Sequence, residues 1–270
     1  DRSPSRGLGD VYKRQMKNGD IHKKMFVPEP PEGCDLSQEH ILLHCCCAPC
    51  STAIIEWMVG AGLRPGIFFS NSNIVPFREY SIRRDELIRY AAAHGLETID
   101  DEYDHAAWLA FVRQLETIPV AESVEATNSG GAASHRQVQG SVIRIADMPE
   151  RGPRCLECFK FRLLRAARYA AVNGYTLLTT TLASSRWKDL NQVDAAGRWV
   201  CDVINGIYDG KCAIDSEVNS KFPLSGRQNK VTWWNQNWRR GGLQERRNAL
   251  IKEWDMYNQT FCGCEFSLKH

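Results

Sequence analysis

The residues that point most directly to chemistry in this sequence are its cysteines, of which there are 11 among 270 residues. Cysteine thiolates are ligands for zinc and for iron–sulfur clusters, and two neighbouring thiols can form a redox-active disulfide. An odd number in a chain with eight Trp to fill a core does not fit a secreted disulfide scaffold. Eight of the cysteines fall into three groups: Cys45, Cys46, Cys47 and Cys50; Cys155 and Cys158; and Cys262 and Cys264.

The first group favours an iron–sulfur cluster. The spacing Cys155-x-x-Cys158 alone is compatible with zinc, with a cluster or with a redox dithiol. The first group, however, directly follows a short apolar run, residues 41–44, which we expect to be a strand. Ligands of open α/β sheets bind at the carboxyl ends of the strands. Adjacent cysteines there suit a centre with several irons better than one compact tetrahedral zinc.

The pair Cys262 and Cys264 has two interpretations. Thiols separated by one residue can close only a tight ring, and Gly263 supplies the backbone freedom that this ring needs. Such a disulfide would be strained and easily reduced, which suits an electron relay. A second pair of metal ligands is the alternative, and both stay open.

The three remaining cysteines, Cys34, Cys201 and Cys212, are isolated in the sequence. We expect Cys201 and Cys212 to be small buried side chains and Cys34 to be unligated. The sequence contains no apolar run long enough for a membrane span and no signal peptide. We therefore expect a cytoplasmic protein with no membrane partner.

Alternating strands and helices must position these groups. We expect a helix capped by Ser51, another beginning at Pro76, and helices over residues 104–115 and 155–172. This alternation predicts a three-layer Rossmann-like α/β fold, a mostly parallel sheet with helices on both faces. The predicted strands cover residues 41–44, 67–69, 96–99 and 175–181.

The domain organisation follows from composition. Residues 1–36 contain several Pro and Gly and predict a disordered or extraneous tail. Residues 37–268 predict a single α/β catalytic domain. Within it, residues 117–147 are rich in Ser and Gly and predict an exposed insertion.

In its cysteine groups and their surroundings, the sequence resembles the cobalamin-independent epoxyqueuosine reductases. The resemblance runs in order from residue 40 to residue 267, and no cobalamin motif is seen. Four separate cysteine motifs make it specific. It rests on residues 43–50 (LHCCCAPC), 72–74 (SNI) with Glu79, Tyr80 and Arg83, 149–158 (PERGPRCLEC) with Arg162 and Leu163, 179–182 (TTTL) and 257–264 (YNQTFCGC).

The resemblance implies reduction of epoxyqueuosine to queuosine at the wobble position of tRNA, with an external electron donor. It also implies an adenine nucleotide alpha hydrolase-like (HUP-type) fold with a C-terminal helical extension that contains the Cys-Gly-Cys sequence. Asn258 stands where the family usually has Arg. A zinc-stabilised RNA-binding module and a thiol–disulfide oxidoreductase using Cys262 and Cys264 are the alternative functions.

Two ligand sets follow from the resemblance, and they compete for the same residues. In the preferred set, a 4Fe-4S cluster is held by Cys46, Cys47, Cys155 and Cys158. Cys262 and Cys264 then form the redox-active disulfide, and Cys50 is a ligand to an additional mononuclear iron. In the second set, the cluster is held by Cys155, Cys158, Cys262 and Cys264, and the iron by Cys46, Cys47 and Cys50.

Some of the expected tRNA contacts lie in a basic segment, residues 221–254. This segment contains eight Lys and Arg residues but only two Glu residues. Lys and Arg neutralise phosphates, and Trp233, Trp234 and Trp238 could stack on splayed anticodon bases. The alternative is a solvated helix face with the Trp side chains in the core. The predicted substrate or tRNA contacts are Asn73, Glu79, Tyr80, Arg83, Arg239 and Arg240.

Overall fold

The computed structural model of the chain describes residues 28–117, 144–208 and 229–267. The predicted insertion falls largely on residues 118–143, and Cys212 and most of the predicted tail also lie outside the described residues. The helices are α2 (Ala48–Gly60), α3 (Phe77–Ala93), α4 (His105–Arg113), α5 (Pro153–Val172), α6 (Leu190–Tyr208) and α7 (Leu243–Glu253). Short 3-10 turns are η1 (Gln114–Thr117), η2 (Ile145–Asp147), η3 (Thr181–Ser184) and η4 (Glu265–Ser267).

A five-stranded sheet forms the centre, in the order β3-β2-β1-β4-β5. Every pair of neighbouring strands is parallel. The central strand β1 is buried along its whole length, because helices cover both faces of the sheet. The strands are β1 (Ile41–Cys45), β2 (Gly66–Phe69), β3 (Thr98–Asp100), β4 (Leu177–Thr180) and β5 (Thr232–Trp233).

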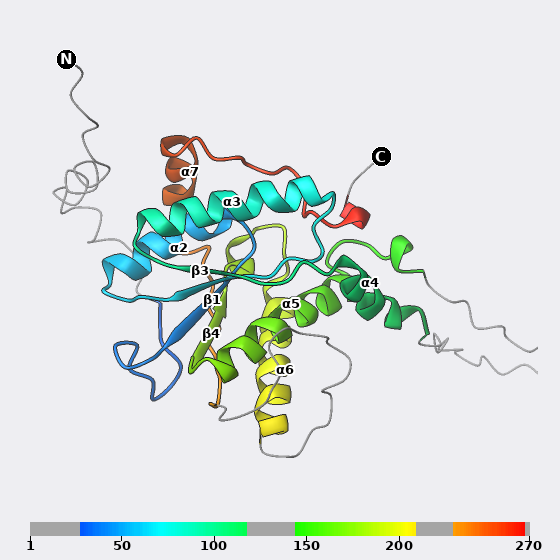
Figure 1. The fold of residues 1–270 in the computed structure, drawn as a ribbon, viewed down its shortest axis with the longest axis horizontal. Coiled ribbons are helices and arrows are strands. Elements are labelled where there is room, and N and C mark those ends of the chain that lie inside the picture. Colours follow the sequence, from blue (N-terminus) through cyan, green and yellow to red (C-terminus); the bar gives the residue numbers. More distant parts are fainter. Residues whose placement is uncertain (1–27, 118–143, 209–228, 268–270) are drawn as a thin grey trace, which may run out of the picture.

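The helices form two layers around the sheet (Figure 1). Helices α2, α3 and α7 cover one face, and α4, α5 and α6 cover the other. The predicted three-layer α/β architecture with a parallel sheet is therefore confirmed. Among the residues that the structure describes, no helix combines the length and hydropathy that a membrane span requires.

The predicted elements are confirmed with shifted ends. The expectation that Ser51 caps the first helix is wrong, because α2 begins at Ala48 and its N-cap is Cys47, four residues before Ser51. Pro49 lies in the first turn of α2, where a fixed φ favours a helix start. The Ser51 hydroxyl instead donates to the Cys47 carbonyl oxygen at 2.7 Å. Strand β3 lies about two residues further along the chain than predicted.

The fold brings the cysteine groups to one edge of the sheet. Cys46 and Cys47 directly follow β1, and the carboxyl ends of all parallel strands meet at the same edge. Helix α5 precedes β4 and runs in the opposite direction, so Cys155 and Cys158 in its first turns lie at this edge too. The C-terminal segment (residues 257–267) returns to the same edge, where the Val75 N–H donates to the Gly263 carbonyl oxygen at 2.9 Å.

Candidate metal centre

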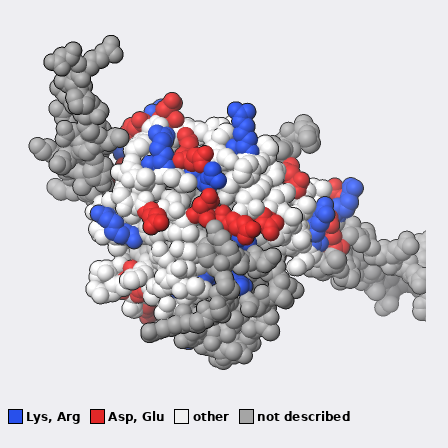
Figure 2. Space-filling view, in the orientation of Figure 1, with Lys and Arg blue, Asp and Glu red and all other residues white. Residues whose placement is uncertain are grey.

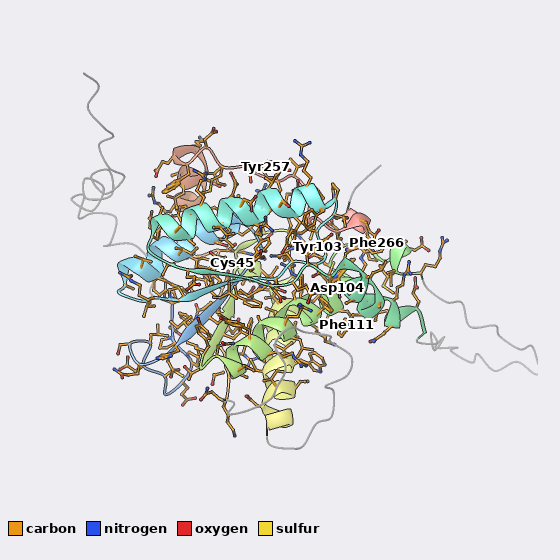
Figure 3. All side chains as sticks on the ribbon, in the orientation of Figure 1. Cys45, Tyr103, Asp104, Phe111, Tyr257 and Phe266 are labelled. Carbon is orange, nitrogen blue, oxygen red and sulfur yellow. The ribbon has the colours of Figure 1, made fainter. Side chains whose placement is uncertain are left out.

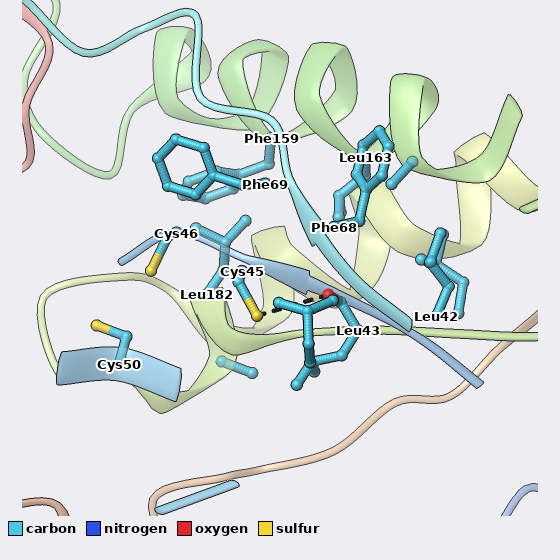
Figure 4. Packing of buried hydrophobic residues seen from close by; sticks show 14 of the residues in the cluster. Leu42, Leu43, Cys45, Cys46, Cys50, Phe68, Phe69, Phe159, Leu163 and Leu182 are labelled. Atoms are coloured by element: carbon cyan, nitrogen blue, oxygen red, sulfur yellow. Dashed lines mark hydrogen bonds between the residues drawn. The ribbon is translucent and has the colours of Figure 1, made fainter. Parts of the chain in front are cut away.

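Three buried thiols form the most compact part of the site. The sulfur atoms of Cys46, Cys47 and Cys50 all lie within 4.8 Å of one another. The Cys46 and Cys47 sulfurs are 3.8 Å apart. Figure 4 shows the Cys46 and Cys50 side chains on the loop after β1 and on the first turns of α2. Cys45 is not part of this trio, because its thiol donates to the Leu43 carbonyl oxygen at 3.5 Å (Figure 4).

The spacing of the trio fits one metal ion. Four thiolates at about 2.3 Å from a tetrahedral metal lie about 3.8 Å from one another. The Cys46–Cys47 distance is 3.8 Å, which matches this value. Three thiols in one compact, buried group can therefore hold a mononuclear metal ion.

Hydrogen bonds with two other parts of the chain fix the trio. The Cys46 N–H donates to Thr181 Oγ1 at 3.1 Å, and Gln259 Nε2 donates to Cys47 Sγ at 2.7 Å. Hydrogen bonds from the Cys47 and Cys50 thiols, together with the cations Arg162 and Lys188, hold the pKa of Cys46 well below its usual range. The site thus favours a thiolate, the form that binds metals.

Cys155 and Cys158 form the second part of the site, at the start of α5. The Arg151 N–H donates to Cys155 Sγ at 3.3 Å. Burial, reinforced by the neighbouring Cys158 thiol, raises the pKa of Cys155 to about 11. Burial also raises the pKa of Cys158, and the Cys262 thiol adds to the shift of both residues. The third group therefore lies within electrostatic reach of the second.

Cys262 and Cys264 are both free thiols in this structure. A hydrogen bond from Cys264 and the Lys188 ammonium hold the pKa of Cys262 well below its usual range. Lys188 Nζ lies 3.1 Å from Cys262 Sγ. Gly263 between them has φ 109°, and a Cβ there would meet the Ile74 side chain at 3.0 Å, so glycine is required.

Two cations connect the three groups. Lys188 lowers the pKa of Cys46 and Cys262 and opposes the burial that raises the pKa of Cys158. Arg162 on α5 acts on the same three thiols, and it is buried. Seven thiols that shed protons on binding metal would concentrate negative charge, and these two cations offset part of it. The donor set, its burial and its charge fit a metal centre held by thiolates.

Glu79 and Arg83, predicted substrate contacts, hold the C-terminal segment in place. Arg83 forms a buried ion pair with Glu79 at 2.6 Å. It also donates from Nη1 to the Cys262 carbonyl oxygen at 3.0 Å and from Nη2 to the Phe261 carbonyl oxygen at 3.3 Å. The Tyr257 hydroxyl donates to Glu79 Oε2 at 2.8 Å. Figure 3 shows Tyr257 above α3, at the start of this segment.

The other two predicted contacts on this side, Tyr80 and Asn73, are also buried. The Tyr80 hydroxyl donates to Asp100 Oδ1 at 3.1 Å. Asn73 follows β2, and its Oδ1 has no hydrogen-bond partner among the described residues. A buried amide oxygen without a partner is rare in native proteins, so Asn73 fits a ligand contact better than Tyr80 does.

The basic segment differs from its prediction. The expectation that its indoles stack on bases is wrong for Trp234 and Trp238, which are each 1% exposed and pack against each other in the core. The alternative, Trp in the core, holds for them. Arg239 donates to the carbonyl oxygens of Ser185 and Lys188, so it is engaged within the protein, whereas Arg240 is exposed. On the face in Figure 2, basic and acidic side chains lie side by side.

Sequence reasoning missed Lys188 and Gln259. Their contacts to Cys262 and Cys47 span 74 and 212 positions of the chain, so no local spacing indicates them. Gln259 lies within the YNQTFCGC motif, so the motif could have indicated that it belongs to the site. Lys188 lies in none of the motifs, so the sequence gives no indication of its role.

Comparison with known proteins agrees with this site. The sequence profile of epoxyqueuosine reductase QueH matches residues 41–123, 116–208 and 216–270. The chain is 32% identical over 263 residues to epoxyqueuosine reductase QueH of Histophilus somni, covering 96% of this chain and 84% of that protein. Identity is 30% to the Haemophilus influenzae protein, with the same coverage. It is 31% to the Acinetobacter baylyi protein, covering 86% of this chain and 81% of that protein.

The profile thus matches most of the chain, including all three cysteine groups, and the relatives align over most of their own lengths. The chain belongs to the epoxyqueuosine reductase QueH family.

Proposed function

We propose that this protein reduces epoxyqueuosine to queuosine at the wobble position of tRNA. The observation that carries the proposal is the buried set of thiols at the carboxyl edge of the sheet, in a chain of the QueH family. In the reaction, both C–O bonds of the epoxide break, a carbon–carbon double bond forms, and the oxygen leaves as water. This takes two electrons and two protons, and an external donor supplies the electrons.

The thiols would hold a 4Fe-4S cluster and an additional mononuclear iron, which supply single electrons and a Lewis acid for the epoxide oxygen. The spacing of the sulfur atoms favours the second ligand set. The Cys46 and Cys47 sulfurs have the spacing of two ligands to a single tetrahedral ion, and all three sulfurs of the trio with Cys50 lie within 4.8 Å of one another. Ligands to different irons of a cluster lie further apart. The remaining four thiols then hold the cluster: Cys155, Cys158, Cys262 and Cys264.

The first ligand set remains the competitor, with Cys46, Cys47, Cys155 and Cys158 on the cluster. In that set, Cys262 and Cys264 form the redox-active disulfide and Cys50 binds the extra iron. The free thiols of Cys262 and Cys264 would then represent its reduced state. Lys188 stabilises a Cys262 thiolate in either arrangement.

The fold type and the cellular location of the protein are the next parts of the proposal. The strand order β3-β2-β1-β4-β5 supports a Rossmann-like, HUP-type domain over residues 37–268, with the Cys-Gly-Cys segment as its C-terminal extension. A set of seven free thiols persists under reducing conditions, which supports a cytoplasmic location.

Incubation of the reconstituted protein with epoxyqueuosine-containing tRNA and dithionite, followed by nucleoside mass spectrometry, tests the function. We expect queuosine to form. Cys46→Ala abolishes its formation, while Cys201→Ala, which removes a buried thiol of α6 outside the site, leaves it intact. A colourless, zinc-loaded protein without activity would instead support an RNA-binding module. Activity that persists without iron would support a thiol–disulfide oxidoreductase.

A further inference from the structure

The loop between η3 and α6 displays an exposed indole. Trp187 is 64% exposed, more than any other large hydrophobic side chain among the described residues. The Arg186 guanidinium lies over its ring, 5.0 Å from the centroid. An exposed aromatic ring with an arginine beside it is the combination that binds unstacked nucleic acid bases.

Two arginines hold this loop, residues 185–188, in one conformation. Arg151 donates from Nε to the Trp187 carbonyl oxygen at 3.0 Å and from Nη2 to the Arg186 carbonyl oxygen at 3.1 Å. Arg239 donates to the Lys188 carbonyl oxygen at 2.6 Å and to that of Ser185. Four consecutive carbonyl groups are thus engaged by two guanidinium groups. The 185–188 loop is therefore organised before any partner binds, which lowers the entropy cost of binding.

The 185–188 loop also borders the thiols. Lys188, next to Trp187, directs its ammonium to Cys262 Sγ at 3.1 Å. Arg151, which holds the loop, donates its backbone N–H to Cys155 Sγ at 3.3 Å. Consecutive Cα atoms are only about 3.8 Å apart. The exposed indole therefore lies at the rim of the site where the reaction would occur.

The charge around the 185–188 loop suits a polyanion. Arg151, Arg186 and Arg240 are exposed. The acidic neighbour Asp189 accepts the Asn191 N–H at 2.8 Å at the start of α6, so its carboxylate is engaged by the helix. Exposed arginines beside an aromatic ring match the phosphates that flank each base.

Resting on the proposed tRNA substrate, we propose that the 185–188 loop binds the anticodon loop. The Trp187 indole stacks on an unpaired base beside the wobble nucleoside, and Arg186 contacts an adjacent phosphate, while Arg151 holds the loop in place. In this proposal the aromatic side chain that contacts a base is Trp187, outside the basic segment, and not the buried Trp234 or Trp238.

Fluorescence anisotropy with labelled epoxyqueuosine-containing tRNA tests the proposal. Stacking on one aromatic side chain contributes roughly 1–3 kcal/mol, so Trp187→Ala should raise the Kd about 5- to 150-fold. Trp187→Phe keeps an aromatic face and should raise it much less. Arg186→Glu should weaken binding and make the dependence of Kd on salt less steep.

Arg64→Glu is the matched control, because Arg64 is exposed in the turn before β2, at the opposite edge of the sheet. It should leave the Kd within about twofold of wild type. Iron content and visible absorption establish that each variant is folded and loaded. Wild-type Kd values for Trp187→Ala and Arg186→Glu, in a protein that reduces tRNA, would overturn the inference and leave the function standing. Trp187-dependent binding without any queuosine formation would overturn the function and leave the binding surface standing.

Discussion

Replacing Lys188 tests whether its charge sets the redox potential of the centre. Its ammonium lies 3.1 Å from Cys262 Sγ and within electrostatic reach of the Cys46, Cys155 and Cys158 thiols. Burial alone would lower the pKa of Lys188, but the Cys262 and Cys46 thiols together outweigh it and raise the pKa above the usual value. The side chain therefore stays positively charged at neutral pH. A fixed cation stabilises the more negative, reduced state of a nearby redox centre.

The distance gives the expected size of this effect. An electron added to a centre bound at Cys262 would lie about 5 Å from the ammonium, which corresponds to about 3 kcal/mol at an effective dielectric constant of about 20. For a one-electron couple, this equals about 130 mV. Lys188 is only half-buried, and solvent screening reduces the figure to about 50–100 mV. Lys188→Met should lower the reduction potential by this amount, and Lys188→Arg should keep it within about 20 mV.

The assay is a spectroelectrochemical titration of the reconstituted protein, followed by visible absorption. Lys252→Met serves as the control, because Lys252 is an exposed lysine near the end of α7. We expect its potential to stay within about 20 mV of wild type, since water and salt screen an exposed charge. An unchanged potential in Lys188→Met would refute the reasoning. Equal shifts of the reduction potential in Lys188→Met and Lys252→Met would refute it as well, because the shift would then come from the net charge of the protein and not from the position of Lys188.

Three further predictions concern the ligands and the frame. Cys46→Ser should remove about one iron and keep the cluster absorption, whereas Cys155→Ser should remove the cluster; iron analysis and absorption that show the cluster lost in both would favour the first ligand set, in which Cys46 is a cluster ligand. Arg165→Met should lower the free energy of unfolding by about 3–5 kcal/mol in urea titrations, because it leaves Asp101 buried and unpaired; an unchanged midpoint would contradict this. Tyr257→Phe removes a hydrogen bond from the C-terminal segment to α3, so amide hydrogen exchange in residues 257–264 should accelerate, and an unchanged rate would count against that anchor.

The fold was largely predictable because its strands are buried on both faces. Such strands are continuous apolar runs, as in residues 41–44, and they alternate with segments of helical spacing. The prediction of a helix start was wrong where two local sequence preferences competed. Ser51 is a favoured cap residue, but Pro49 starts α2 earlier. The prediction for the Trp-rich part of the basic segment was wrong for a different reason. Composition does not show which Trp side chains are buried in the core and which are exposed.

The site was predictable as a set of thiols but not as a geometry. The cysteine spacing gave the ligand types, and the strand order indicated the edge where they meet. The trio of Cys46, Cys47 and Cys50 separates from the other four only when distances are known. Lys188 and Gln259 reach the thiols from distant parts of the chain, and such contacts leave no periodic signal.

A buried polar frame holds the strand ends next to the thiols. His44 of β1 donates from Nε2 to the Ser70 carbonyl oxygen at 3.1 Å and accepts from the Thr180 hydroxyl at 2.7 Å, so it links the ends of three strands. Burial lowers the pKa of His44 to about 3, which keeps its ring neutral and able to make both bonds. Arg162 binds the same Ser70 carbonyl oxygen at 3.3 Å. One strand end cannot shift in this frame without breaking buried hydrogen bonds, so the frame restrains the Cys46 thiol that follows β1.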